Sequence, residues 1–158
     1  MKPEQRWWQS IKTNLPTAGD RLDRVENSLS SGAPDVNGCM DSEDIWLELK
    51  APIEPKRAGT KLIHGRNHEL LLSQRNWFAR QKQAGGIAFI LVRTDKRVML
   101  IDGTIYADTF NDLTVDELTA ISLYHFPVPI KKDNWRLLRH VITTATRYRR
   151  LHSILKPK

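Results

Sequence analysis

The hydrophobic residues of this chain follow two patterns, and each pattern predicts a different secondary structure. In five segments apolar side chains recur three and four positions apart, which is the spacing of one face of an α-helix. We expect these helices at residues 3–15, 20–29, 68–84, 114–124 and 134–155. In four shorter segments apolar residues alternate with polar ones or run together, which predicts strands at residues 35–40, 45–49, 87–93 and 97–102.

Residues at the ends of the predicted helices support this assignment. Pro16 stops the first helix, and Asp20 stands where the second helix would need an N-cap. Gly85 ends the third helix. Thr114 and Glu117 have the spacing of a capping box that begins the fourth helix.

The length of the chain predicts one domain. The sequence has 158 residues, of which 40% are hydrophobic, and this is enough for a single core of one sheet and its helices. Residues 51–67 contain Pro, Gly, Lys and Arg without hydrophobic periodicity, so we expect a long loop there. Loops of this length inside a compact domain are usually functional or mobile.

Other features bear on the location of the protein. The longest apolar run, Ile87–Val92, has the length of a strand and is too short to cross a bilayer, so no membrane partner is expected. The stretch from Met1 to Trp8 lacks the apolar core of a signal peptide. The single Cys39 cannot form an internal disulfide. These features predict a cytoplasmic protein.

The net charge of +7 is unevenly distributed along the chain. Residues 131–158 contain nine Lys and Arg and one acid, Asp133, which gives this segment a charge of +8. The preceding 130 residues have a charge of −1. A basic segment on a nearly neutral body suits a polyanionic partner such as nucleic acid, and a solvated basic tail is the alternative interpretation.

Two acids and one lysine form a pattern that suits metal-dependent cleavage of a phosphodiester. Asp35 follows a Gly-Ala-Pro turn, and Glu48 stands two residues before Lys50 in an apolar strand, so Glu48 and Lys50 share one face of the sheet. Mg²⁺ prefers oxygen ligands, and one or two carboxylates with a substrate phosphate are enough to bind it. Asp35 and Glu48 are the candidate ligands. Lys50 is the candidate for orienting the attacking water or neutralising charge on the phosphate.

The order helix, strand, strand, helix, strand, strand, together with these motifs, resembles the PD-(D/E)XK nuclease superfamily. The resemblance is to the VRR-NUC and Holliday-junction-resolvase-like branch that bacteriophages often encode. It covers about residues 20–102. It rests on four motifs, which are Glu26, Ser31-Gly32-Ala33-Pro34-Asp35, Glu48-Leu49-Lys50 and Gln74.

The resemblance implies a restriction-endonuclease-like α/β domain with a central mixed sheet between helices. Residues 1–19 would form an N-terminal helix, residues 20–110 the nuclease core, and residues 111–158 a basic helical extension. The implied catalytic residues are Glu26, Asp35, Glu48, Lys50 and Gln74. Mg²⁺, with Mn²⁺ as a substitute, would be bound by Asp35, Glu48, the carbonyl of Leu49 and Glu26.

Each candidate also has a structural interpretation. Asp35 could cap the turn that precedes it, and Glu48 could pair with Lys50 on an edge strand that faces water. Glu26 could be a solvated helical acid, and Gln74 an ordinary surface residue. The five histidines show no metal-ligand spacing, so we assign them no metal.

Three groups of basic residues are candidate DNA contacts. The loop after the Glu48 strand supplies Lys56, Arg57, Lys61 and Arg66. The helix of Gln74 supplies Arg75 and Arg80. The last helix is amphipathic, and its basic side carries Arg136, Arg139, Arg147, Arg149 and Arg150. The alternative for this helix is a structural role with solvated arginines.

These observations together predict a Mg²⁺-dependent DNA endonuclease, with branched DNA as the substrate that the resemblance favours. It would act in the host cytoplasm if a phage encodes it. The alternatives are a site-specific homing or restriction-like endonuclease and a DNA-binding protein with a vestigial nuclease site. Symmetric incision of two strands needs two active sites, so we also expect a homodimer.

Overall fold

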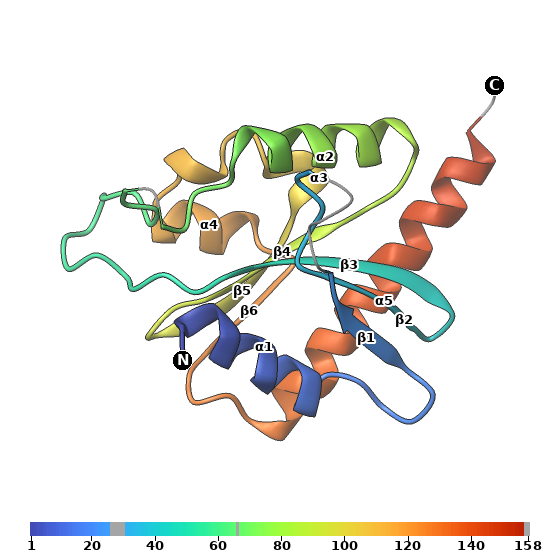
Figure 1. Ribbon diagram of the computed structural model, residues 1–158, viewed down its shortest axis with the longest axis horizontal. Helices are drawn as coiled ribbons and strands as arrows, with labels where there is room; N and C mark the ends of the chain where they lie inside the picture. The colour runs from blue at the N-terminus through green and yellow to red at the C-terminus, as the bar shows by residue number, and fades with distance from the viewer. Residues whose placement is uncertain (26–30, 66, 157–158) are drawn as a thin grey trace.

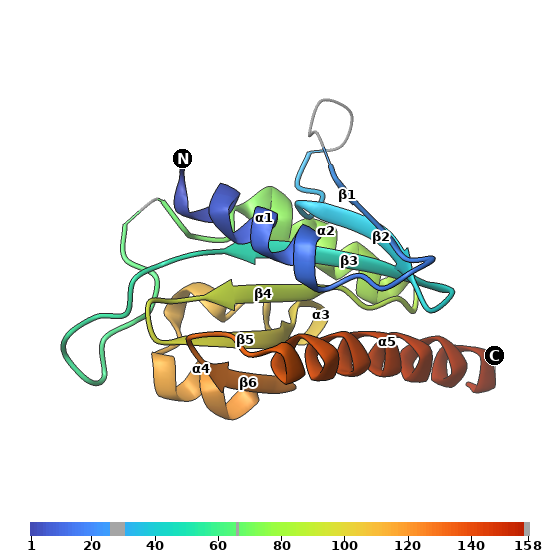
Figure 2. The same ribbon diagram turned by 90° about the horizontal axis from the view of Figure 1, so that it is seen from below.

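A six-stranded mixed sheet lies at the centre of the computed structural model, which describes residues 1–25, 31–65 and 67–156 (Figures 1 and 2). The strands occur in the sheet in chain order: β1 (Arg21–Arg24), β2 (Val36–Met40), β3 (Glu43–Lys50), β4 (Phe89–Arg93), β5 (Arg97–Asp102) and β6 (Tyr124–Pro127). Neighbouring strands are antiparallel except β3 and β4, which are parallel. The sheet therefore consists of two antiparallel halves, β1–β3 and β4–β6, which meet at the single parallel pair of β3 with β4.

Short turns join two of the antiparallel pairs, β2 with β3 and β4 with β5, and a long crossover makes the parallel pair. Asp41 and Ser42 join β2 to β3 with φ angles of 53° and 64°, the left-handed conformation that a two-residue hairpin turn needs. In the β4–β5 turn, Thr94 Oγ1 accepts hydrogen bonds from the N–H groups of Lys96 and Arg97. A parallel neighbour requires the chain to cross over the sheet, and α2 (Leu72–Gln83) lies in that crossover.

Helices cover both faces of the sheet (Figure 2). On one face lie α1 (Pro3–Asn14) and α5 (Lys132–Leu155), whose Trp7 and Leu138 belong to a core with Leu47 of β3. On the other face, Phe78 of α2 and Leu118 belong to a second core. The shorter helices are α3 (Gly103–Tyr106), α4 (Val115–Ile121) and the 3₁₀ helix η1 (Phe110–Asp112).

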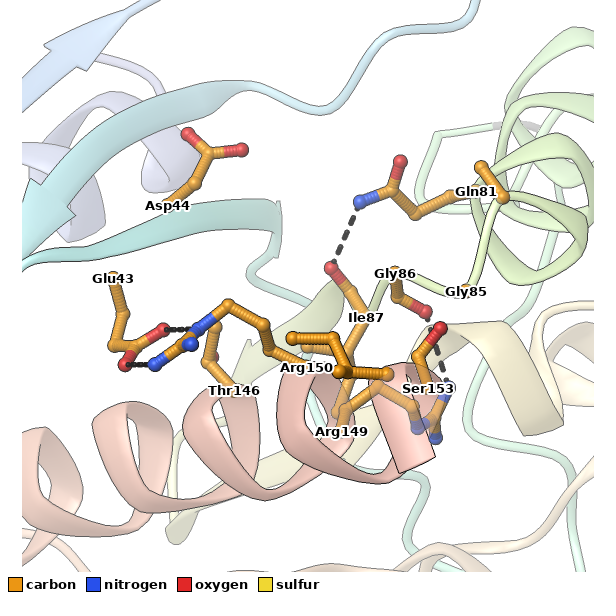
Figure 3. Close-up of a pocket in the computed structure, with 12 residues that line it drawn as sticks. Glu43, Asp44, Gln81, Gly85, Gly86, Ile87, Thr146, Arg149, Arg150 and Ser153 are labelled. Carbon is orange, nitrogen blue, oxygen red and sulfur yellow. Dashed lines mark hydrogen bonds and ion pairs between the residues drawn. The ribbon is translucent and has the colours of Figure 1, made fainter. Parts of the chain in front are cut away.

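Ion pairs fix α5 to the sheet. Arg139 binds both carboxylate oxygens of Asp20 at 2.8 and 2.9 Å, and Arg149 binds Asp102 at 2.8 Å. Arg147 lies 3.2 Å from Glu43, and Arg150 lies 2.9 Å from it; Figure 3 shows the pair of Arg150 with Glu43. Their hydrogen bonds hold the pKa of Asp20 and of Glu43 below the ordinary range, Asp20 through Arg139 and Glu43 mainly through Arg150.

The structure confirms the predicted α/β class, with a central mixed sheet, flanking helices and a C-terminal helix in one domain. The predicted helices at residues 3–15 and 134–155 and the four predicted strands are present within a few residues. The predicted helix at 68–84 begins four residues later, at Leu72. The helix opened by Thr114 ends at Ile121, and Thr114 Oγ1 accepts from the N–H of Glu117 as the capping box requires.

The predicted helix at residues 20–29 is wrong where the structure describes it. Residues 21–24 form β1, which pairs with β2. Leu22 packs directly over Gly38, where a Cβ would lie 2.7 Å from the leucine side chain, so the lack of a side chain at Gly38 admits this strand. Asp20 binds Arg139 rather than capping a helix.

Three short elements were not predicted: α3, η1 and β6. β6 has four residues and contains a proline, so its pattern is too short to indicate a strand. Because β6 pairs with β5, the segment 111–158 contributes a strand to the central sheet as well as α5. Of the helices in the described ranges, none is both long and apolar enough for a membrane span.

We expect Arg139→Gln to destabilise the protein at neutral pH, because Asp20 is 4% exposed and would lose its cationic partner. Removing one member of a buried pair costs about 3–5 kcal/mol, and the partial exposure of Arg139 reduces this to about 2–3 kcal/mol. The pKa of Asp20 is lowered in the folded state, so its contribution is lost as the pH falls below about 4. Urea denaturation should therefore show a smaller difference in the free energy of unfolding between the wild type and Arg139→Gln at pH 3 than at pH 7.

Arg136→Gln is the matched control on the same helix. Its partner Asp133 lies 3.6 Å away, and the two side chains are 71% and 83% exposed. Such pairs contribute less than about 0.5 kcal/mol. Equal losses in the two variants would contradict a structural role for the pair of Arg139 with Asp20.

Candidate active site at the end of β3

Two charged side chains of β3 are buried on the face that α2 covers. Glu48 is 1% exposed and Lys50 is 6% exposed, as the alternation along the strand predicted for a shared face. β3 lies between β2 and β4, so the alternative of an edge-strand pair facing water is wrong. A buried carboxylate beside a buried ammonium needs specific partners.

Glu48 has partners on one of its oxygens and none on the other. Its Oε1 lies 2.9 Å from Lys50 Nζ and accepts a hydrogen bond of 2.6 Å from Gln74 Nε2. Its Oε2 is buried and has no hydrogen-bond partner within the described part of the chain. Lys50 Nζ also donates to the carbonyl of Glu69, at 3.3 Å. This oxygen without a partner could bind a cation or accept a hydrogen bond from a further donor.

Burial raises the pKa of Glu48 to about 7, from an ordinary value of 4.5. The negative charges of Asp35 and Glu4 raise this pKa as well, whereas the ammonium of Lys50 lowers it. A carboxyl with a pKa near neutrality exchanges its proton for another cation at little cost. Such perturbed groups are concentrated at functional sites.

Asp35 lies at the end of β2, where the pairing of β2 with β3 stops. The last pair is Val36 with Leu47, and the next free N–H of β3, that of Leu49, donates to Asp35 Oδ2 at 2.9 Å. Asp35 Oδ1 lies 3.5 Å from the guanidinium of Arg24. Asp35 therefore supports the sheet by accepting the N–H of Leu49. Among the described residues, its other oxygen has only the ion pair with Arg24, whose side chain is 38% exposed.

The Gly-Ala-Pro turn before Asp35 packs against the beginning of α2. Gly32 has a φ angle of 84°, and a Cβ at this position would lie 2.1 Å from the carbonyl oxygen of Ser73. Only glycine therefore fits this contact. The contact places the turn that carries Asp35 directly beside the residue that precedes Gln74.

Gln74 has two contacts that fix its orientation. Its Oε1 accepts the N–H of Leu71 at 2.9 Å, which satisfies one free donor at the N-terminus of α2. Its Nε2 is then directed to Glu48. The structure thus brings together four of the five predicted catalytic residues. The fifth, Glu26, lies outside the described residues.

Glu4 and His68 were not predicted. Glu4 is in the first turn of α1, and its Oε1 lies 3.3 Å from His68 Nδ1 in the segment before α2. Its charge acts on Glu48, so it belongs to the same acidic environment. Nothing in the local sequence links Glu4 to a strand more than 40 residues away.

The predicted basic residues of the loop and α2 differ in their exposure to solvent and in their ion pairs. Lys56, Arg57 and Arg80 are exposed, whereas Lys61 forms an ion pair of 2.7 Å with Asp112. Arg75 is half-buried, and its Nε has no hydrogen-bond partner among the described residues. Arg66 lies outside the described residues.

Two further arginines near the end of β3 were also missed. Arg6 of α1 and Arg93 of β4 line a cavity of about 380 Å³ together with Ala51, which follows Lys50. Arg93 stacks over the ring of Trp7, 5.4 Å from its centroid. The first turn of α1 therefore carries Glu4, which bonds to His68 beside the acidic site, and Arg6, which lines a cationic cavity.

Four of the five predicted arginines of α5 form ion pairs with the body of the protein. Arg139, Arg147, Arg149 and Arg150 reach back to carboxylates of the sheet and the segments beside it. Arg136 is exposed and pairs with Asp133. The charge of +8 in this segment is therefore partly neutralised within the protein. Contact of these residues with DNA stays a prediction.

A cavity of about 270 Å³ lies at the opposite end of β3, between the end of α2 and α5 (Figure 3). Its polar groups bind one another: Arg150 binds Glu43, Arg149 donates to the carbonyl of Gly86, and Gln81 donates to the carbonyl of Ile87. Among the described residues that line this cavity, no buried side-chain oxygen or nitrogen lacks a partner as Glu48 Oε2 does. The end of β3 that carries Glu48 remains the candidate active site.

The oxygen donors at this end of β3 fit a hard divalent cation. The buried free oxygen of Glu48 and the carboxylate of Asp35 are the ligand types that Mg²⁺ prefers. In residues 1–25, 31–65 and 67–156, no three Asp, Glu, His or Cys side chains lie close enough to bind one metal ion together. Mg²⁺ commonly takes one or two protein carboxylates and completes its shell with water and substrate phosphate.

No protein-family model matches this chain, and a comparison with curated proteins finds no match either. The residues at the end of β3 are therefore the features of this chain that indicate a function.

Glu48→Gln should stabilise the metal-free protein at pH 8 and change its stability little near pH 4. A carboxyl whose pKa is raised by folding binds its proton more tightly in the folded state, so the wild type loses stability as the pH rises from about 4.5 to about 7. The loss is on the order of 3 kcal/mol. Glutamine cannot ionise and keeps an oxygen for Lys50. Urea denaturation in EDTA at several pH values measures the effect.

Asp108→Asn is the control, because Asp108 is an exposed carboxyl. We expect no difference from the wild type at pH 4 or at pH 8. A stability difference for Glu48→Gln that is independent of pH would show that Glu48 ionises in the folded protein as it does in water.

Proposed function

We propose that this protein is a metal-dependent DNA endonuclease with a site of the PD-(D/E)XK type. One observation carries the proposal: Asp35, Glu48, Lys50 and Gln74 meet at the end of β3, and Glu48 has a buried oxygen with no partner among the described residues. A buried carboxyl with a raised pKa costs stability. A protein retains such a group when it binds a cation or takes part in chemistry.

Each of the four residues at the end of β3 would have a separate role in cleavage. Asp35 and Glu48 would bind Mg²⁺, or Mn²⁺ in its place. When bound, the ion supplies a Lewis acid for the phosphate and lowers the pKa of a coordinated water. Lys50 supplies an ammonium 2.9 Å from Glu48 and would neutralise negative charge that develops on the phosphate. Gln74 holds the Glu48 carboxylate in place.

Two further groups, the carbonyl of Leu49 and the carboxylate of Glu4, are candidates for a place beside the metal. The N–H of Leu49 is used by Asp35, and its carbonyl as a metal ligand stays a prediction. Glu4 is the acid of α1 whose charge acts on Glu48, so it is a candidate for a role beside the metal. Its hydrogen bond with His68 would keep it near the site.

DNA is the proposed substrate because cations on several elements lie near the end of β3. Arg6 and Arg93 line one cavity at the end of β3 and β4, and Lys56 and Arg57 line another in the loop that follows β3. Phosphate contacts of this kind position a nucleic acid without reading its sequence. Branched DNA is the preferred substrate, and the proposed enzyme acts as a homodimer because two incisions need two sites.

The protein with Mg²⁺ should cleave DNA, and Asp35→Asn, Glu48→Gln or Lys50→Ala should each lower the rate about 100-fold or more. Each variant removes a ligand or a stabilising charge and leaves the basic surface unchanged. Cleavage is measured on four-way junctions, flaps, single strands, linear duplex and supercoiled plasmid. Binding is measured separately in Ca²⁺, which should permit binding and suppress cleavage because its larger and looser coordination shell positions the water poorly.

The choice of substrate decides between the candidate activities. Preferential cleavage of junctions supports a structure-selective enzyme, and cleavage of one duplex sequence supports a site-specific one. Binding without cleavage of any substrate in Mg²⁺ or Mn²⁺ would support a DNA-binding protein with a vestigial site. Full activity of Glu48→Gln would remove the proposed active site.

The double variant Lys56→Gln/Arg57→Gln should bind every DNA more weakly and reduce the slope of log K against log salt by about one to two units, because each phosphate contact contributes about 0.9. Both side chains are exposed and lie in the loop that follows β3. Arg136→Gln is the comparison on α5, and we expect a smaller change because Asp133 partly neutralises Arg136. The opposite order of effects would assign the DNA contact to α5.

A further inference from the structure

The outward side of α5 carries an uncharged stripe with regular spacing. Its residues are separated by alternating steps of four and three, and they are Leu137, Val141, Thr144, Tyr148, Leu151 and Leu155. Tyr148 is 70% exposed and Leu155 is 78% exposed, and Leu137 and Leu151 are partly exposed. Steps of three and four place residues on one seam of a helix, as in the a and d positions of a coiled coil.

The opposite side of α5 is held against the sheet. Trp135, Leu138 and Ile142 lie in the core. The ion pairs of Arg139 and Arg149 with carboxylates of the body draw two cations away from the stripe. The helix is therefore fixed with its uncharged side outward, and Figure 2 shows its last turns continuing past the strands of the sheet.

A groove runs beside this stripe. It has a volume of about 490 Å³, and its lining includes Val141, Tyr148, Ile87 and Leu123. Leu123 lies on the far wall, after α4, and is 46% exposed. The stripe and the groove form one continuous apolar surface that a second helix could occupy.

We propose that this surface binds a second copy of the chain through antiparallel packing of the two α5 helices. In an antiparallel pair centred on Thr146, Leu137 of one copy lies opposite Leu155 of the other, and Val141 lies opposite Leu151. Thr144 lies opposite Tyr148. All six stripe residues are matched by this single register, so the surface is complementary to itself under a two-fold axis.

The exposed area suits this occupant. The exposed fractions of Leu123, Leu137, Tyr148, Leu151 and Leu155 correspond to about 550 Å² per copy, taking roughly 200 Å² for a fully exposed large side chain. Two copies would bury about 1,100 Å², which exceeds the roughly 1,000 Å² that a specific interface needs. The inward ion pairs also reduce the repulsion that two basic helices would otherwise experience.

This interface does not depend on nuclease chemistry, so a test of assembly is separate from a test of cleavage. Light scattering should give the wild type twice the monomer mass of 18.3 kDa at micromolar concentration. Tyr148→Glu should give a monomer, because it places a charge in the centre of the stripe. We expect it to weaken the affinity of one copy for the other at least about tenfold. Ile105→Arg is the control, since Ile105 is 55% exposed on α3, outside the stripe.

Cross-linking tests the register with smaller changes. In a Cys39→Ser background, a mixture of Thr144→Cys and Tyr148→Cys proteins should form disulfide dimers more readily than either protein alone. Faster cross-linking of each single variant with itself would indicate parallel helices and overturn the proposal. A monomeric wild type, a dimer unaffected by Tyr148→Glu, or binding of α5 to lipid vesicles in place of self-association would overturn it as well.

Discussion

The parallel pairing of β3 with β4 is the constraint on which the arrangement of the molecule depends. Antiparallel neighbours need only a short turn, whereas this pair obliges the chain to leave one end of β3 and return to the other. The returning segment carries the loop after Lys50, then His68, then α2 with Gln74. The crossover therefore delivers the side chain of Gln74 and the carbonyl of Glu69 to the face of β3 that carries Glu48 and Lys50.

The site combines a stability cost with precise support. Burial of Glu48 raises its pKa, and the cost is tolerated because Lys50 and Gln74 satisfy one oxygen. Gln74 is itself fixed in position, because its side chain accepts the N–H of Leu71 and Gly32 packs against the first turn of α2. The second oxygen is the part of the carboxylate that this network leaves without a partner among the described residues.

The sequence predicted those features that depend on neighbouring residues. Alternation gave β3 and the shared face of Glu48 and Lys50, and the local motifs identified Asp35 and Gln74. Long-range pairing decided the rest. The spacing of Leu22 and Val25 fits a helix, yet residues 21–24 pair with β2 because Leu22 packs over Gly38. The proximity of Glu4 to the site, like the ion pairs of the α5 arginines, follows from tertiary packing and has no local signal.

The ion pairs of α5 also order the events of folding. Arg139 binds a residue 119 positions earlier, and Arg150 binds one 107 positions earlier. Asp20 and Glu43 therefore receive these partners only after α5 has been synthesised. Until then the α1 face of the sheet lacks part of its cover, and domains in this condition expose apolar surface that favours aggregation. The core on this face is complete only when α5 packs against it.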